Sequence, residues 1–325
     1  MKPTLILAAA MPLLLIAALG LGDQPIPPGQ VLSALLGAAN APPDAVFILN
    51  QLRLPRALLA VSIGAALAMA GAICQAAMRN PLAEPGLIGI NGGAGLAALV
   101  LIIGMPGVSL LWLPWAAFGG ALIMVALIQG LALRVGMRSQ RIILIGIGCG
   151  ALTGGFAGLL SAFGDISSLQ RAMVWMAGSL QDSRWEKLWV LLLWLAPAAL
   201  LLMWLAPMLD LLGFDDPVVR GLGVSPAWSR AGMLLLCAVI AAAAVAATGP
   251  IGFVGLIAPH IARYLVGVGH RHMLPLSALI GAALLLIADT IGRSVIAPAQ
   301  IPAGLITALL GAPFFGWLMW RRRHE

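Results

Sequence analysis

Arg53 and Arg56, near the start of an apolar stretch, are the first side chains whose spacing could do chemistry. Residues three apart on a helix face the same side. Pro55 suits a first helical turn, because its missing N–H would have no partner there. Such a pair of arginines could bind the carboxylates of an acidic partner. It could also anchor a helix at a membrane surface with the charged groups reaching water, and the spacing alone favours this anchor.

A second cluster, residues 79–93, begins Arg-Asn-Pro-Leu and contains two prolines and four glycines. These residue types interrupt a helical pattern. Within a membrane, irregular backbone is tolerated where it packs inside protein or lines a water-filled path. The cluster therefore predicts either a gate in a substrate path or a tight turn between two helices, and its composition does not choose between them.

A third cluster spans residues 212–224. Asp215 and Asp216 stand ahead of Pro217, which is typical of a helix start, and Gly221 or Gly223 would end that helix. We therefore predict a short amphipathic helix. It could fit a groove on a partner protein or lie on the bilayer.

Residues suited to catalysis or metal binding are isolated. His260 has no second His, Cys or carboxylate three or four positions away, which favours a packed histidine over a ligand or proton relay. The three cysteines lie far apart in apolar runs and read as small core residues: Cys74, Cys149 and Cys237. We predict no catalytic residue and no metal site. No Gly-x-x-x-x-Gly-Lys-Ser/Thr sequence occurs, so another polypeptide would have to bind any ATP that drives this chain.

The elements that must position these residues are membrane-spanning helices. Apolar residues make up 62% of the chain and charged residues 9%, against roughly a quarter charged in soluble domains. The apolar residues form long unbroken runs, which indicate helices rather than the short alternating strands of a barrel. The net charge is +7, but the basic residues are scattered among the apolar runs and form no stripe, so they do not indicate nucleic-acid binding.

We predict an all-α bundle that forms one domain over residues 1–325. A helix needs about 20 apolar residues to cross a bilayer, and about ten spans are expected: 4–22, 55–78, 90–105, 111–134, 142–163, 187–206, 229–248, 252–267, 273–296 and 303–320. The many glycines suit close packing of helices in lipid. Three polar segments, 23–51, 164–187 and 210–229, could each hold one short interfacial helix.

The basic residues predict the orientation of the bundle. With Lys2 inside and ten crossings, twelve of the 18 basic residues fall inside, among them the terminal Arg321–Arg323. Cytoplasmic loops carry the excess of Lys and Arg, so both termini are expected in the cytoplasm. Lys2 and the apolar run that follows also resemble a secretory signal peptide, but an uncleaved first helix is favoured because no small-x-small cleavage pattern stands out.

The order of the motifs carries a family resemblance. Arg-Leu-Pro-Arg is followed by Gly64 to Ala68 with Gly71 and Gln75, by Asn-Pro-Leu-Ala at 80–83, by Gly-Phe-x-Gly-Leu-x-x-Pro-His at 252–260, by Ala288-Asp289, and by Gly-Ala-Pro at 311–313 with Phe315. From about residue 50 to 320 this series resembles the FecCD-type permease subunits of bacterial ABC importers for iron-siderophores, haem and cobalamin. The resemblance implies the bundle of the type II importer permeases in the inner membrane. It also implies a dimer of permeases, two ATPase subunits that use ATP and Mg²⁺, and a periplasmic binding protein.

The resemblance also implies roles for individual residues. Arg53, Arg56 and Arg293 match arginines that meet acidic residues of the binding protein. The cytoplasmic gate would contain Asn80 and Leu82 in one loop and Ser139 and Gln140 in the other, although the family prefers a small hydroxyl residue where Gln140 stands. The coupling helices that seat in the ATPase would contain Asp215, Asp216, Arg220, Gly221 and Gly223.

Alternating access driven by ATP is the mechanism that this resemblance implies. Ferric siderophore is the expected cargo, with cobalamin or haem as the alternative, and the chain is expected to bind no cofactor itself and to pair as a homodimer. An ion-coupled secondary transporter would need ionisable groups within the spans. Only Asp289, which could instead pair with Arg293 four residues on, and Glu84 are available. A membrane enzyme would need a nucleophile and base that converge, and the sequence places no cysteine, carboxylate or second histidine three or four positions from His260.

Overall fold

The computed structural model describes residues 2–38 and 42–322. In these two ranges the chain is helical, and seven helical stretches are long and apolar enough to cross a membrane. They are α1 (Lys2–Gly20), the continuous stretch Pro43–Ala77, the stretch Leu110–Val135, α7 (Ser139–Phe163), α9 (Trp185–Trp204), α12 (Pro226–Thr248) and α14 (His270–Ser294). Three shorter apolar helices complete the bundle: α5 (Ile90–Leu99), α13 (Val254–Val266) and α15 (Ala303–Arg322). Each of these ten elements overlaps one of the ten predicted spans.

The second span is longer than predicted and contains a change of helix type. It begins with α3 (Pro43–Phe47), continues through a π-helix (Ile48–Arg53) and ends with α4 (Leu54–Ala77). Pro55 stands in the first turn of α4, as expected. Proline removes one helical hydrogen bond. The π-helical turn ahead of Pro55 lets the helix continue through this position, so that no new helix has to begin there. The sequence pattern therefore placed the start of this span about twelve residues too late.

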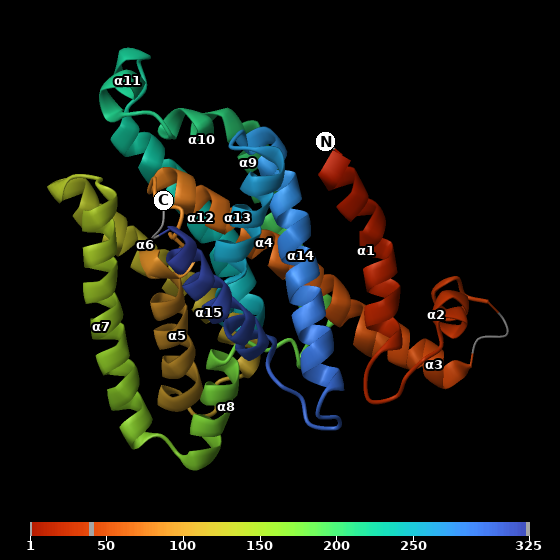
Figure 1. Cartoon of the computed structure of the whole chain (residues 1–325). Coiled ribbons are helices and arrows are strands. Elements are labelled where there is room, and N and C mark those ends of the chain that lie inside the picture. The colour runs from red at the N-terminus through yellow and green to blue at the C-terminus, as the bar shows by residue number, and fades with distance from the viewer. Residues whose placement is uncertain (1, 39–41, 323–325) are drawn as a thin grey trace.

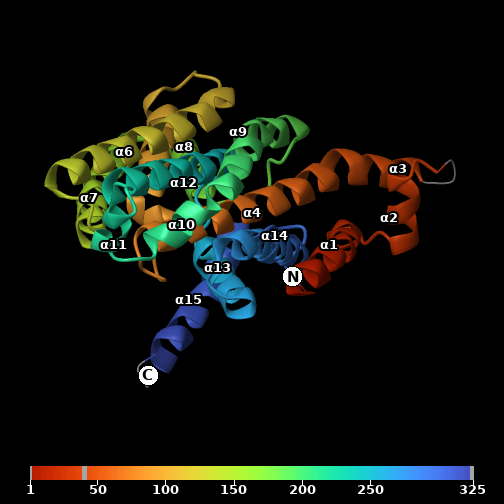
Figure 2. The same cartoon turned by 90° about the horizontal axis from the view of Figure 1, so that it is seen from above.

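Two helices form the centre of the bundle. The apolar stretches of Pro43–Ala77 and α12 are each 78% buried, whereas those of α1 and α7 are each 17% buried. In α4, a Cβ atom added to Gly71 would lie 1.9 Å from the carbonyl oxygen of Gly255 in α13, and one added to Gly64 would lie 2.2 Å from that of Gly281 in α14. Small residues permit such close backbone approach in a membrane. Figure 2 shows α4 extending from α3 into the middle of the bundle.

Short helices occupy the polar segments. Residues 23–51 hold α2 (Pro28–Leu35) and α3, where one short helix was predicted, and residues 164–187 hold α8 (Ile166–Met176). Helix α10 (Ala206–Leu212) and helix α11 (Asp216–Gly221) lead from α9 to α12. Helix α6 (Leu113–Val135) forms most of the stretch Leu110–Val135.

The two ends of the bundle differ in what they carry. The chain's N-terminus, α10 and α11 lie at one end, which we call the α11 end, and α8 lies toward the other, which we call the α8 end (Figure 1). Because α4, α6 and α9 all run toward the α11 end, the connections α4–α5 and α6–α7 lie there too. Arg323, the last of the terminal arginines, lies outside the described residues.

Candidate functional site

The three arginines predicted to dock a binding protein lie together where α4 begins and α14 ends. Arg56 forms two short bonds to the Asp289 carboxylate, from Nε to Oδ2 at 3.0 Å and from Nη2 to Oδ1 at 2.9 Å. Its Nη1 donates to Oε1 of Gln300 at 2.7 Å. Arg293 Nε approaches the same carboxylate at 3.8 Å. The pairing of Asp289 with Arg293 across one helical turn is thus present, but Arg56 is the closer partner.

The other contacts of this arginine cluster are made with the end of α1. Arg53 donates to the carbonyl oxygens of Leu19 at 2.7 Å and Gln24 at 2.6 Å, and Arg293 donates to that of Ala18. Helix ends leave carbonyls without intrahelical partners, and cations are favourable there. Arg53 and Arg293 are only 8% and 6% exposed. In this conformation the cluster satisfies acceptors of its own chain, and its role in docking stays a prediction.

The first predicted gate loop is a compact turn between α4 and α5. Asn80 Oδ1 accepts a hydrogen bond from the backbone N–H of Leu82 at 3.0 Å, which is the bond of an Asx turn. Arg79 adopts a positive φ of 46°, a conformation that few non-glycine residues take. Burial raises the pKa of the Glu84 carboxyl above its usual range. The loop is therefore held by local hydrogen bonds, as a turn between two spans must be.

The second predicted gate loop touches the first. Ser139 begins α7, and its hydroxyl donates to the carbonyl oxygen of Met78, at the end of α4. Gln140, the next residue, is exposed. The structure thus brings Ser139 beside the loop of Asn80 and Leu82, although the two segments are some 60 residues apart in the chain. Whether they open and close stays a prediction.

The predicted coupling segment forms the short helix expected from its sequence. Helix α11 begins at Asp216, directly before Pro217, and ends at Gly221, while Gly223 turns the chain with a φ of 78°. Asp215, Arg220, Gly221 and Gly223 are exposed at the α11 end. Asp216 is not: it bonds to Arg79 Nη2 at 2.8 Å and to Arg230 Nη2 at 2.6 Å. The hydrogen bonds from Arg230 hold the pKa of Asp216 below its usual range.

Sequence reasoning missed two of these basic residues as site residues. Arg79 belongs to the cluster predicted to interrupt a helix, and Arg230 is one of the twelve basic residues predicted on the inner side, but the sequence predicts no contact of either with Asp216. Arg79 lies 137 residues from Asp216 along the chain and Arg230 lies 14 residues from it, and neither separation is the three- or four-residue spacing that pairs side chains on one helix. Charge offered no cue either, because acidic residues outnumber basic ones in residues 212–224.

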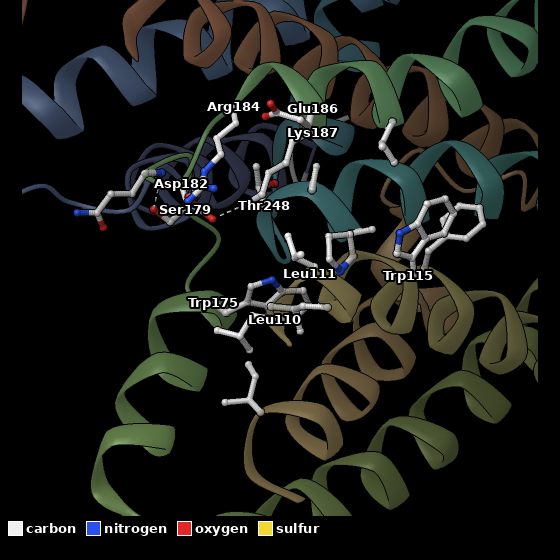
Figure 3. A pocket seen from close by; sticks show the side chains of 18 of the residues that line it. Leu110, Leu111, Trp115, Trp175, Ser179, Asp182, Arg184, Glu186, Lys187 and Thr248 are labelled. Atoms are coloured by element: carbon white, nitrogen blue, oxygen red, sulfur yellow. Dashed lines mark hydrogen bonds and ion pairs between the residues drawn. The ribbon is translucent and has the colours of Figure 1, made fainter. Parts of the chain in front are cut away.

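A large cavity lies among α6, α8, α9 and α12, away from the residues discussed above (Figure 3). Its volume is about 1230 Å³, and its wall combines tryptophans such as Trp115 and Trp175 with charged side chains. Asp182 there bonds to Arg184 at 3.1 Å and to Lys187 at 3.0 Å. No motif in the sequence predicted this cavity. Asp182 is thus paired with two basic side chains of the wall, and a third basic residue, Arg171, donates to the hydroxyls of Ser167 and Ser168.

The residues considered for catalysis or metal binding, His260 and the three cysteines, pack against other side chains or are buried in the protein. His260 packs its ring edge-on against Phe314, with the ring centres 6.0 Å apart. The three cysteines are buried free thiols, as expected of small core residues. Over residues 2–38 and 42–322, no group of three or more His, Cys, Asp or Glu side chains is arranged to hold a metal ion.

Comparison with known proteins places these features in a family. The chain is 41% identical over 317 residues to the Fe(3+)-citrate import system permease protein YfmE of Bacillus subtilis, which covers 97% of this chain and 93% of that protein. It is 40% identical over 279 residues to the hemin transport system permease protein HmuU of Yersinia pestis, covering 85% and 84% of the two chains.

A solved structure agrees with these relatives. A chain described as an inward-facing conformation of a metal-chelate type ABC transporter superposes with a TM-score of 0.89 at 31% identity, covering 98% of this chain and 99% of that one. The sequence profile of the FecCD transport family matches residues 10–321. The match spans the arginine cluster, both predicted gate loops and α11. The chain is a multi-pass membrane protein and belongs to the FecCD transport family.

Proposed function

We propose that this chain is the transmembrane subunit of an ATP-driven importer that moves a ferric siderophore from the periplasm to the cytoplasm by alternating access. The observation that carries the proposal is the meeting of the two predicted gate segments, where Ser139 bonds to the carbonyl of Met78 at the end of the molecule that also carries α11. A gate beside a partner-binding helix is what an externally powered permease requires. The similarity to permeases named for ferric citrate and hemin transport supports the cargo class.

The energy for transport comes from partners in this proposal. The sequence has no phosphate-binding loop, so two separate subunits bind ATP and Mg²⁺, and this chain holds no cofactor. A second copy of the chain completes the path, and a periplasmic protein delivers the cargo. The complex sits in the bacterial inner membrane with both termini in the cytoplasm.

The test of this function is transport by the reconstituted complex. Proteoliposomes would contain the permease, its ATPase subunits and the binding protein, and uptake of radiolabelled iron from ferric citrate would be measured. We expect uptake that requires ATP and that disappears when the ATPase cannot hydrolyse it. Uptake driven by a proton or sodium gradient with no ATPase present would instead identify a secondary transporter. Parallel assays with a ferric hydroxamate, haem and cobalamin would separate the alternative cargoes, of which haem is supported by the similarity to HmuU.

We also propose that the binding protein docks on the face formed by the arginine cluster of Arg53, Arg56 and Arg293. Support comes from the gathering of three arginines: Arg56 and Arg293 share the Asp289 carboxylate, and Arg53 beside them donates to backbone carbonyls that carry no charge. Charge complementarity speeds association and makes it salt-dependent. Binding of the periplasmic protein should therefore weaken as salt rises. Substitution Arg56→Gln should reduce that salt dependence, whereas unchanged binding and salt dependence would place docking elsewhere.

A further inference from the structure

Three charged side chains at the α11 end form one connected ion-pair network. The carboxylate of Asp216 accepts hydrogen bonds from Arg79 Nη2 at 2.8 Å and from Arg230 Nη2 at 2.6 Å, both through Oδ1. Its Oδ2 accepts a further bond from Arg230 Nη1 at 3.2 Å. One carboxylate therefore holds two guanidinium groups that would otherwise repel each other.

The network joins three separate elements. Asp216 belongs to α11, and Arg230 belongs to the first turns of α12. Arg79 directly precedes Asn80 of the first gate loop, and it also donates from Nε to the carbonyl oxygen of Leu212, at the end of α10, at 2.8 Å. Arg230 reaches the second gate segment, because its Nη1 donates to the carbonyl oxygen of Met137 at 3.3 Å, two residues before Ser139.

Little else fixes α11 to the bundle. Val219 is the one buried residue of this described helix, and its neighbours Val218 and Arg220 are exposed. The network residues are better shielded: the side chain of Arg230 is 7% exposed, that of Arg79 30% and that of Asp216 34%. The positive φ of Arg79 needs surrounding contacts to hold it, and the bonds to Asp216 and Leu212 supply them. A displacement of α11 would therefore pull on Arg79 and Arg230.

We propose that Asp216, Arg79 and Arg230 form the joint through which movement of α11 reaches both gate segments. The inference rests on the proposed function, since it assumes that an ATPase moves α11. It assigns positioning roles to Arg79 and Arg230 and separates Asp216 from its neighbour Asp215. The Asp215 side chain is 88% exposed and lies 3.7 Å from Arg79 Nη1, so it faces outward to a partner and contributes little to the joint.

The test compares gate movement with ATP hydrolysis in the same complex. Permease and ATPase subunits are reconstituted in nanodiscs, with a spin label at Gln140→Cys in each permease copy. The three native cysteines are buried, which directs the label to the introduced one. Electron-resonance distance measurements report the gate with and without ATP, while phosphate release reports hydrolysis. For Asp216→Asn we expect the ATP-dependent shift in the distance distribution, per ATP hydrolysed, to fall about ten-fold.

Two comparisons make the result decisive. Asp182→Asn removes a carboxylate that is 66% exposed near the cavity of Figure 3, and it should leave gate movement per ATP unchanged. Arg79→Gln removes the bonds of Arg79 to Asp216 and Leu212 but keeps the pair of Asp216 with Arg230. It serves as the second test variant where Asp216→Asn fails to assemble. If Asp216→Asn or Arg79→Gln assembles and shows the same gate movement per ATP as the wild type, the proposal of a joint is wrong. Absence of ATP-driven gate movement in the unsubstituted complex would instead overturn the proposed function.

Discussion

Loss of the Asp289 charge should destabilise the fold strongly, because its buried carboxylate pairs with both Arg56 and Arg293. Its side chain is 3% exposed, and that of Arg56 is 12% exposed. Removing one partner of a buried pair leaves an uncompensated charge, which costs about 3–5 kcal/mol. We therefore expect Asp289→Asn to lower the free energy of unfolding by that amount, measured by denaturation of the permease in detergent. The exposed pair of Asp182 is the control, and Asp182→Asn should cost about 0–1 kcal/mol. Equal effects of the two substitutions would contradict the buried-pair account.

Glu84 should make stability depend on pH. Burial raises the pKa of its carboxyl above the ordinary value of 4.5, so the folded chain holds this proton more tightly than the unfolded chain. The contribution of Glu84 to stability is then fully present below pH 4.5 and is lost as the pH rises through the folded pKa. Glu84→Gln should raise the melting temperature more at a pH above the folded pKa of Glu84 than at pH 4.5. A melting-temperature difference that stays constant across the range would show that Glu84 does not titrate there.

These residues mark where sequence reasoning stops. The spacing of Arg53 and Arg56 predicted an early helical turn, whereas the structure places them at the junction of the π-helix and α4, and the identity of their partners could not follow from the spacing. Asp289 lies 233 residues from Arg56 in the chain, and the acceptors of Arg53 are backbone carbonyls that carry no residue-type signal. Which polar side chains meet over long range depends on how the helices pack. The local sequence pattern of each helix does not specify that packing.

At the scale of elements, the contact of α4 with α13 depends on the absence of side chains. A Cβ on Gly71 would lie 1.9 Å from the carbonyl oxygen of Gly255, so Gly71→Ala forces the backbones apart. Overpacking of this kind costs about 1–3 kcal/mol. The matched control is Gly148→Ala in α7, where nothing lies within 4 Å of the added atom. Alanine favours a helix there by about 1 kcal/mol. The two variants should shift the melting temperature in opposite directions, and a stabilising Gly71→Ala would contradict the packing described.

For the whole molecule, the sequence predicted the ten apolar helices because seven apolar runs are long and three shorter ones are bounded by polar, glycine or proline residues. It also predicted α11 from its acidic start and its glycine stop. It did not predict that Pro43–Ala77 is one continuous helical stretch, because a π-helix ahead of Pro55 leaves no mark in hydropathy. The ion-pair network around Asp216 was also beyond reach, since it joins residues from three elements whose packing no single segment encodes.

The orientation of the whole molecule follows from the same charges and can be measured directly. A single membrane crossing, α9, separates Glu186 from Asp215, so these two exposed positions should lie on opposite sides of the membrane. The excess of basic residues places Asp215 in the cytoplasm. We expect a membrane-impermeant maleimide to label Glu186→Cys in intact spheroplasts and Asp215→Cys only in inside-out vesicles. The native cysteines are buried and give a low background. The reverse pattern would invert the bundle and place α11 out of reach of any cytoplasmic ATPase, whereas labelling of both positions from one side would remove α9 from the spans.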